Sequence, residues 1–111
     1  VDFRVGSPTF GRAISVELDS IENKQLFIPR GFLHGFSVLS EDAIVNIKID
    51  RYFAAGESIG VKYDDKDLSI DWKISAKDII LSKADIELKL FKDVISPFDY
   101  GKNYYLMKQF V

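Results

Sequence analysis

The chain contains a single histidine, His34, which lies between two glycines in an apolar stretch that follows a proline-glycine turn signal. The proline ends one extended segment, and the glycines let the backbone bend or approach a ligand closely, so His34 projects from the start of the next strand. A histidine in this position could carry proton transfer or ligand binding, or it could be a hydrogen-bonded core residue. The pattern by itself leaves both interpretations open. The stretch reads Ile28-Pro29-Arg30-Gly31-Phe32-Leu33-His34-Gly35-Phe36.

Two other groups of residues could bind a ligand. Asp64, Asp65 and Asp67 could hold a cation, but we interpret them as a solvated turn. Tyr52 and Phe53 follow an alternating segment, and could either present an aromatic face to a planar ligand or pack as a pair in the core. The sequence contains no phosphate loop, no Gly-x-Ser-x-Gly elbow and no paired-histidine zinc motif.

Composition limits the class of protein. With 111 residues, 47% of them hydrophobic, the chain is expected to form a single domain over 1–111. Its 15 basic and 17 acidic residues are spread along the chain, so we expect no nucleic-acid partner. The chain has no cysteine, and with one histidine we expect neither a metal nor a cofactor. No apolar run approaches roughly 18 residues and no signal-peptide pattern is present, so we expect a cytoplasmic protein with no membrane partner.

The elements that would position these residues are predicted to be mostly strands. Turn signals recur at intervals of about ten residues, which is typical of an all-β sandwich or barrel, and we favour a jelly roll. Leu68, Ile70 and Trp72 alternate and predict a further short strand. A short helix within 82–91 is predicted, because good helix formers follow Ser82, which is placed to cap the helix. The aromatic tail, residues 96–106, is expected to pack against the sheet. The other predicted strands span 13–18, 24–28, 34–39 and 43–49.

Several motifs resemble those of one enzyme family. The segment Val1-Asp2-Phe3-Arg4-Val5-Gly6-Ser7-Pro8-Thr9-Phe10-Gly11 looks like the "VDIRKGSPTFG" segment of the dTDP-4-dehydrorhamnose 3,5-epimerases. Further along, and in the same order, 20–29 resembles "SAENKRQLWIP", 31–36 "GFAHGF", 63–65 "WDDP" and 70–72 "IDW". The resemblance implies a cupin-like jelly roll with a short C-terminal helix, a homodimer, and a barrel mouth that binds a dTDP-linked 4-keto-6-deoxy sugar. It also implies that this domain lacks the family's N-terminal segment.

The resemblance also implies a reaction, in which protons next to the sugar ketone at C3 and C5 are removed and returned through an enolate. Such a site needs a base on one face, an acid on the other, and polar groups that stabilise the enolate oxygen. In the family a histidine is the base, an aspartate orients it and a tyrosine is the acid. The base lies in a "GLHF" motif upstream of "VDIR", and is therefore expected outside this chain.

The other family roles are transferred position by position. The orienting aspartate ends an "LSxKD" motif, for which Asp78 and Asp85 are candidates; Asp85 is preferred because its distance from the tryptophan and the Leu-Phe that follows it fit the family better. The substrate-contacting lysine position falls on Ala84, with Lys83 one residue away. The acid tyrosine position holds Ile47, which cannot donate a proton.

The expected binding residues come from the remaining motifs. His34 matches the family's substrate-contacting histidine, and Phe53 keeps the ring that stacks on thymine, next to Tyr52. Glu57 lies one position from a substrate-contacting glutamate. We therefore predict Asp85 as catalytic. We also predict a cavity shared by His34, Tyr52 or Phe53, and Asp85. The predicted substrate-binding residues are His34, Tyr52, Phe53, Glu57 and Lys83. Two functions stay open: a sugar-nucleotide epimerase, or a catalytically silent homologue that binds a nucleotide sugar or acts as an interaction module. An upstream "GLHF" histidine would favour the epimerase.

Overall fold

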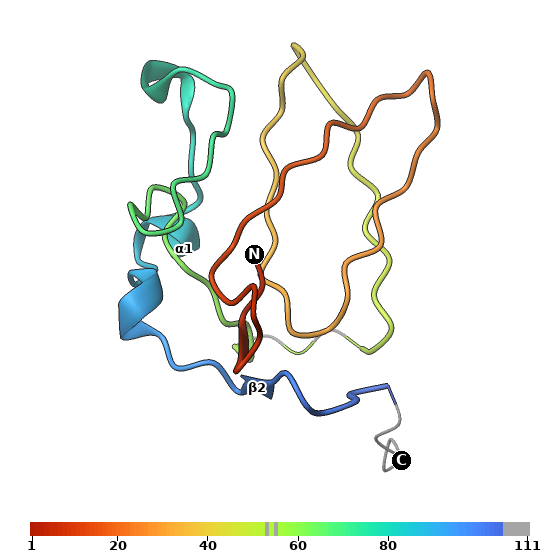
Figure 1. Cartoon of the computed structure of the whole chain (residues 1–111). Helices are drawn as coiled ribbons and strands as arrows, with labels where there is room; N and C mark the ends of the chain where they lie inside the picture. Colours follow the sequence, from red (N-terminus) through yellow and green to blue (C-terminus); the bar gives the residue numbers. More distant parts are fainter. Residues whose placement is uncertain (53, 55, 106–111) are drawn as a thin grey trace.

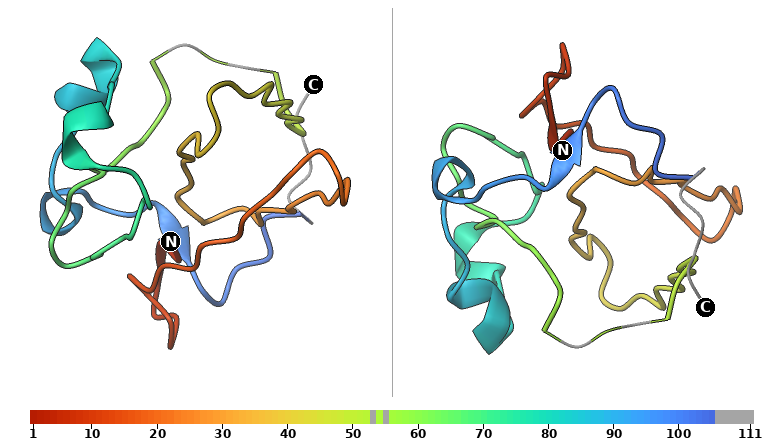
Figure 2. Two further views of the ribbon diagram at one scale, coloured as in Figure 1. Left: turned by 90° about the horizontal axis from the view of Figure 1, so that it is seen from above. Right: turned by 90° about the horizontal axis from the view of Figure 1, so that it is seen from below.

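The computed structural model describes residues 1–52, 54 and 56–105. Two long extended excursions, over roughly the red-to-yellow half of the chain, lie beside a more tightly folded part that holds the short helices (Figure 1). Figure 2 shows the same arrangement from above and below, with the tail passing next to the excursions. The elements are β1 (Arg4–Val5), η1 (Ala76–Asp78), α1 (Lys83–Ile86), η2 (Phe91–Asp93) and β2 (Phe98–Asp99).

The N-terminal residues form the centre around which the other segments pack. Phe3 is buried and its ring lies 5.6 Å from that of Phe91 and 6.2 Å from that of Phe10, measured between centroids. Residues 1–3 run antiparallel to 31–33, with Phe3 N donating to Gly31 O at 3.0 Å. This pairing fixes the backbone directly before His34.

The tail packs against the same N-terminal segment. Strands β1 and β2 pair in parallel, with Arg4 opposite Phe98, and the backbone of Tyr100 donates to Val5 O at 3.0 Å. The ring of Phe98 meets that of Tyr104 edge to face at 5.4 Å. The expectation that the aromatic tail packs is therefore met, although its partner is a two-residue strand and not a larger sheet.

The four strands predicted between residues 13 and 49 are not formed in this structure. Within the described part of the chain, no backbone hydrogen bond joins any two of these segments. Their alternating apolar side chains are largely exposed, Ile44 completely. A strand is stable only when a neighbour completes its ladder of hydrogen bonds, and here the extended segments have no such neighbour. The all-β jelly roll stays a prediction.

The segment 68–72 shows the predicted alternation without being a strand. Leu68 is buried and Ile70 and Trp72 are half-buried, whereas the residues between them are exposed. Ser69 has a φ of 47°, which lies outside the extended region and interrupts the strand. The prediction of a shared face is consistent with this burial, and the prediction of a strand is wrong.

The predicted helix forms for a single turn. Ser82 caps α1, because its hydroxyl accepts a hydrogen bond from Asp85 N at 3.1 Å. The helix does not continue to Phe91, because Lys89 bridges Val61 in parallel and Lys62 N donates to Lys89 O at 2.9 Å. An extended residue in such a bridge cannot also be helical. Over the described ranges, no helix has the length and apolar character needed to cross a membrane.

Candidate functional site

The turn that leads into the His34 segment is packed tightly against the N-terminal residues. Gly31 is buried with a φ of 92°, and a Cβ at this position would lie 2.6 Å from Arg4 Cγ. Both the backbone conformation and the close approach therefore require glycine. Proline and glycine around Arg30 predicted a bend here, and the structure shows a bend that only glycine fits at position 31.

Replacing Gly31 by alanine is expected to lower the free energy of unfolding by about 1–3 kcal/mol, because the added methyl group would collide with Arg4 in a strained backbone conformation. Urea denaturation followed by fluorescence measures the effect. Gly101→Ala is the matched control, because a Cβ at Gly101 meets nothing within 4 Å. Equal stability of the two variants would contradict the assigned packing.

A buried carboxylate holds Arg4 in the position that contacts this turn. Asp2 is 1% exposed and accepts hydrogen bonds from Arg4 Nε at 2.9 Å and Arg4 Nη2 at 2.7 Å, and from the hydroxyls of Ser7 and Thr9 at 2.5 and 2.7 Å. The Arg4 side chain, helped by the two hydroxyls, holds the pKa of Asp2 far below its ordinary value. In return, Asp2 raises the pKa of Arg4. The pair is ionised over the whole physiological range.

Arg4 is also held between two aromatic rings. Its guanidinium carbon lies 4.6 Å from the ring centroid of Phe32 and 5.0 Å from that of Tyr100. Such cation–π contacts favour the charged arginine over a neutral side chain. Arg4 therefore joins the turn, through Phe32, to the tail, through Tyr100.

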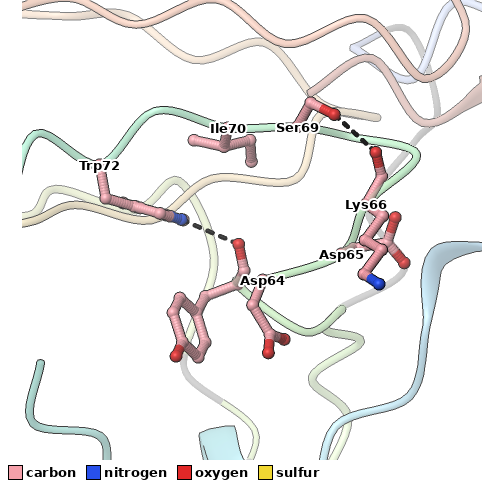
Figure 3. Close-up of a pocket in the computed structure, with 7 residues that line it drawn as sticks. Asp64, Asp65, Lys66, Ser69, Ile70 and Trp72 are labelled. Atoms are coloured by element: carbon pink, nitrogen blue, oxygen red, sulfur yellow. Dashed lines mark hydrogen bonds between the residues drawn. The ribbon is translucent and has the colours of Figure 1, made fainter. Parts of the chain in front are cut away.

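A cavity of about 320 Å³ lies over the acidic turn and Trp72. Figure 3 shows Ile70 and Ser69 on one side of it and Asp64 on the other. The indole nitrogen of Trp72 donates to Tyr63 O at 2.8 Å, and Ser69 Oγ donates to Lys66 O at 2.5 Å. The cavity is lined by Tyr63, Asp64, Asp65, Lys66, Ser69, Ile70 and Trp72.

The acidic turn itself is built around a buried aspartate. Asp65 accepts backbone hydrogen bonds from Phe91 at 2.7 Å, Asp67 at 2.9 Å and Leu68 at 3.1 Å. These bonds, with that from Phe91 first, lower its pKa. Asp65 Oδ1 thus holds the turn itself and Asp65 Oδ2 joins the turn to η2, while Asp64 and Asp67 are exposed. Among the described residues, no group of three or more histidine, cysteine or acidic side chains could hold a metal ion.

Asp85 lines a second, smaller cavity of about 160 Å³. Its carboxylate accepts a hydrogen bond from Ser82 Oγ at 2.6 Å, so it forms part of the cap of α1. Tyr63 and Asp64 line both cavities, which therefore meet at these two residues. Sequence reasoning did not single out Tyr63 as a site residue. The second cavity is lined by Lys62, Tyr63, Asp64, Leu81, Asp85 and Ile86.

Of the predicted site residues that the structure describes, only Asp85 lines either cavity. His34, Tyr52, Glu57, Lys83 and Asp85 are all exposed, and Phe53 lies outside the described residues. Neither His34 nor Tyr52 lines either of the two cavities described above. The expected cavity shared by His34, Tyr52 and Asp85 is therefore not among them.

The His34 segment does approach the first cavity through its neighbours. A Cβ at Gly35 would lie 3.2 Å from Trp72 Cη2, so this glycine lets the backbone pass directly over the indole. Ser37 Oγ donates to Trp72 O at 2.7 Å. Trp72 in turn donates to Tyr63, which lines the Asp85 cavity. A continuous series of contacts thus leads from the residue after His34 to the cavity of Asp85.

Comparisons with known proteins agree with the motifs. The sequence model of the family described as dTDP-4-dehydrorhamnose 3,5-epimerase matches residues 1–93. A protein of that name from Sinorhizobium fredii is 35% identical over 102 residues, which are 92% of this chain and 52% of the relative. One from Shigella flexneri is 38% identical over 93 residues, 84% of this chain and 50% of the relative.

A third relative of the same name, from Pseudomonas aeruginosa, is 39% identical over 93 residues, 84% of this chain and 51% of the relative. The chain thus spans about half the length of the curated relatives it matches. No solved structure matches this one. The ordered motifs, the family match over 1–93 and the identity to three relatives agree, and the chain belongs to the dTDP-4-dehydrorhamnose 3,5-epimerase family.

Proposed function

We propose that this chain forms part of a sugar-nucleotide epimerase site, which binds a dTDP-linked 4-keto-6-deoxy sugar and inverts C3, C5 or both through an enolate. The family match over residues 1–93 carries the proposal, together with relatives named for this reaction at 35–39% identity. No metal or cofactor is needed, because the ketone itself makes the neighbouring protons acidic and a positioned base and acid can move them.

The chain's own residues have distinct parts in this proposal. His34 contacts the sugar, Phe53 stacks on the thymine ring beside Tyr52, and Glu57 and Lys83 supply polar contacts. Asp85 orients the base: its Oδ2 accepts the Ser82 hydroxyl, and the carboxylate keeps further lone pairs that can accept from an imidazole N–H. These roles come from the family motifs and stay predictions.

The second candidate function is a catalytically silent homologue that binds a nucleotide sugar or serves as an interaction module. One observation favours it. Ile47 occupies the position of the acid tyrosine, and its side chain cannot donate a proton. Binding and turnover must therefore be measured separately.

We also infer a cupin-like jelly roll that pairs as a homodimer in the cytoplasm, without nucleic acid or membrane as a partner. The exposed apolar side chains of the excursions, such as Ile14 and Ile44, support association, because an apolar surface of this kind is seldom left in water. Sedimentation at tens of micromolar is expected to give a dimer.

The test of the proposed function combines a binding and an exchange measurement. Titration with dTDP is expected to show saturable binding and to quench Trp72 fluorescence little, because the thymine is expected at Phe53. In deuterated water, these 111 residues are expected to exchange the C3 and C5 protons of the sugar very slowly, because a missing acid or base each removes about 10² to 10⁴ in rate. Absence of dTDP binding would contradict the epimerase and the sugar-binding homologue, and would leave only the interaction module. Rapid exchange would show that a residue of this chain acts as the base, with His34 as the first residue to test.

A further inference from the structure

Arg30 lies in the turn before the His34 segment and contacts two other segments that are distant in sequence. Its Nε and Nη2 donate to Asp50 Oδ2 at 2.9 and 2.5 Å. Its Nη1 donates to the carbonyl oxygen of Tyr104 at 2.5 Å, and its guanidinium carbon lies 5.1 Å from the ring centroid of Tyr105. The backbone N–H of Arg30 donates to the Tyr105 hydroxyl at 3.0 Å. One side chain thus joins three segments.

The two residues of this ion pair lie next to the predicted substrate contacts. Arg30 precedes His34 by four residues, and Asp50 precedes Tyr52 by two. His34 and Tyr52 are the substrate contacts of the proposed function. They belong to the two limbs of the second excursion, His34 before and Tyr52 after its bend at Ser40–Glu41. The tail that completes the junction runs past the bases of both excursions and lies beyond the 1–93 stretch of the family match (Figures 1 and 2).

We propose that Arg30 is a positioning residue, which closes the base of the second excursion by holding the turn before His34 at a set distance from Asp50, and so aligns His34 with Tyr52. The inference rests on the proposed function, because the alignment matters only if both residues contact one ligand. No contact of Arg30 with the sugar is required.

The exposure of the Arg30–Asp50 ion pair argues for a positioning role and against a role in stability. The side chain of Arg30 is 27% exposed and that of Asp50 is 61% exposed, so water screens the ion pair and its contribution to stability is small. Loss of the pair should therefore change the relative placement of two segments far more than it changes unfolding.

The geometry requires arginine in particular. A guanidinium presents its donors in a rigid planar fork, which lets Arg30 reach Asp50 and the Tyr104 carbonyl at the same time. A lysine carries the same charge but has a single ammonium group at the end of a flexible stem, and would satisfy one partner at a time. Arg30→Lys is therefore expected to lose the junction while preserving net charge.

The experiment measures effects that cross from one segment to the other. In NMR spectra of the 111-residue chain without ligand, Arg30→Lys is expected to shift the backbone amide signal of Tyr52, and Asp50→Asn that of His34. The double variant should add little to either single one, because each removes the same junction. Arg12→Lys is the matched control: Arg12 is an exposed arginine outside the junction and should leave both signals unchanged.

The same variants are then titrated with dTDP and unfolded in urea. Arg30→Lys and Asp50→Asn are expected to weaken dTDP binding by about fivefold or more, a factor typical of coupling between linked sites, with little change in the urea midpoint. Unchanged cross-segment amide signals would overturn the positioning role. A large fall in the urea midpoint with unaltered dTDP affinity would also overturn it, in favour of a structural role.

The proposed function and the positioning role of Arg30 can be tested separately. If the wild-type chain does not bind dTDP, the proposed function fails, but the amide shifts still decide whether Arg30 joins the two segments. If the wild-type chain binds dTDP and the Arg30→Lys variant binds equally well, the function stands and the positioning role is wrong.

Discussion

Asp2→Asn is expected to lower the free energy of unfolding by about 3–5 kcal/mol at neutral pH, the largest stability effect in the chain, because it leaves a guanidinium without its buried counter-ion. The carboxylate of Asp2 receives two hydrogen bonds from the Arg4 side chain and one from each of two hydroxyls. An amide carries no charge, and its nitrogen can only donate, so the donors that face this nitrogen lose their acceptor. Chemical denaturation at pH 7 measures the effect.

The same network predicts how stability depends on pH. Hydrogen bonds from Arg4 lower the pKa of Asp2 in the folded chain, so the unfolded chain binds the proton more readily. The stabilisation is therefore fully present above the ordinary aspartate pKa of about 3.9, and is lost as the pH falls below it toward the folded value. Asp2→Asn should remove this part of the acid dependence.

A matched control for Asp2 is available on the surface. Asp99 forms an exposed ion pair with Lys102 at 2.9 Å, and Asp99→Asn is expected to change stability by no more than about 0.5 kcal/mol. If Asp2→Asn and Asp99→Asn had similar effects, the assignment of Asp2 as a buried ion-pair partner would be wrong.

Ile47→Tyr is expected to have the largest effect on chemistry. The measurement uses a chimera in which the segment expected upstream of "VDIR" is taken from the Pseudomonas aeruginosa relative and joined to this chain, so as to supply the base histidine that the family resemblance implies. A phenol at position 47 should then raise exchange of a sugar C3 or C5 proton for deuterium by about 10² to 10⁴, the usual contribution of a positioned proton donor. Ile47 is 58% exposed, so the larger, polar side chain can be accommodated.

The control for this prediction is Ile47→Phe in the same chimera, which adds the ring without the hydroxyl. Only the tyrosine should accelerate exchange. If both variants exchanged at the same rate, the hydroxyl would not be the donor. If the unmodified chimera already exchanged at the rate of the tyrosine variant, another group would supply the proton, and the silent homologue would be excluded.

Local sequence signals predicted local structure well. Ser82 caps α1 as expected, because a serine hydroxyl before a run of helix formers can accept the next free N–H without help from the rest of the fold. The glycine of the Pro-Arg-Gly turn has the positive φ that a bend of this kind requires. The alternation of Leu68, Ile70 and Trp72 reappears as alternating burial.

Elements whose formation requires a partner elsewhere in the chain were predicted less well. The four segments between 13 and 49 have strand-like alternation, but pairing depends on a neighbour that alternation cannot supply. A short helix is predicted within 82–91 and one forms over Lys83–Ile86, but the sequence does not show where it ends, ahead of the bridge of Lys89 to Val61. Ends of elements are set by such contacts, and a single sequence does not reveal them.

By itself, the sequence determined the family, through motifs in a shared order; the roles of His34, Ile47 and Asp85 stay predictions from those motifs. Only the tertiary structure showed that Asp2 is buried beneath Arg4, and that Arg30 joins Asp50 to the tail. The reason is physical: a motif depends on residue types at fixed spacing along the chain. Burial and the partner of a charge depend instead on which distant segments the folded backbone brings into contact.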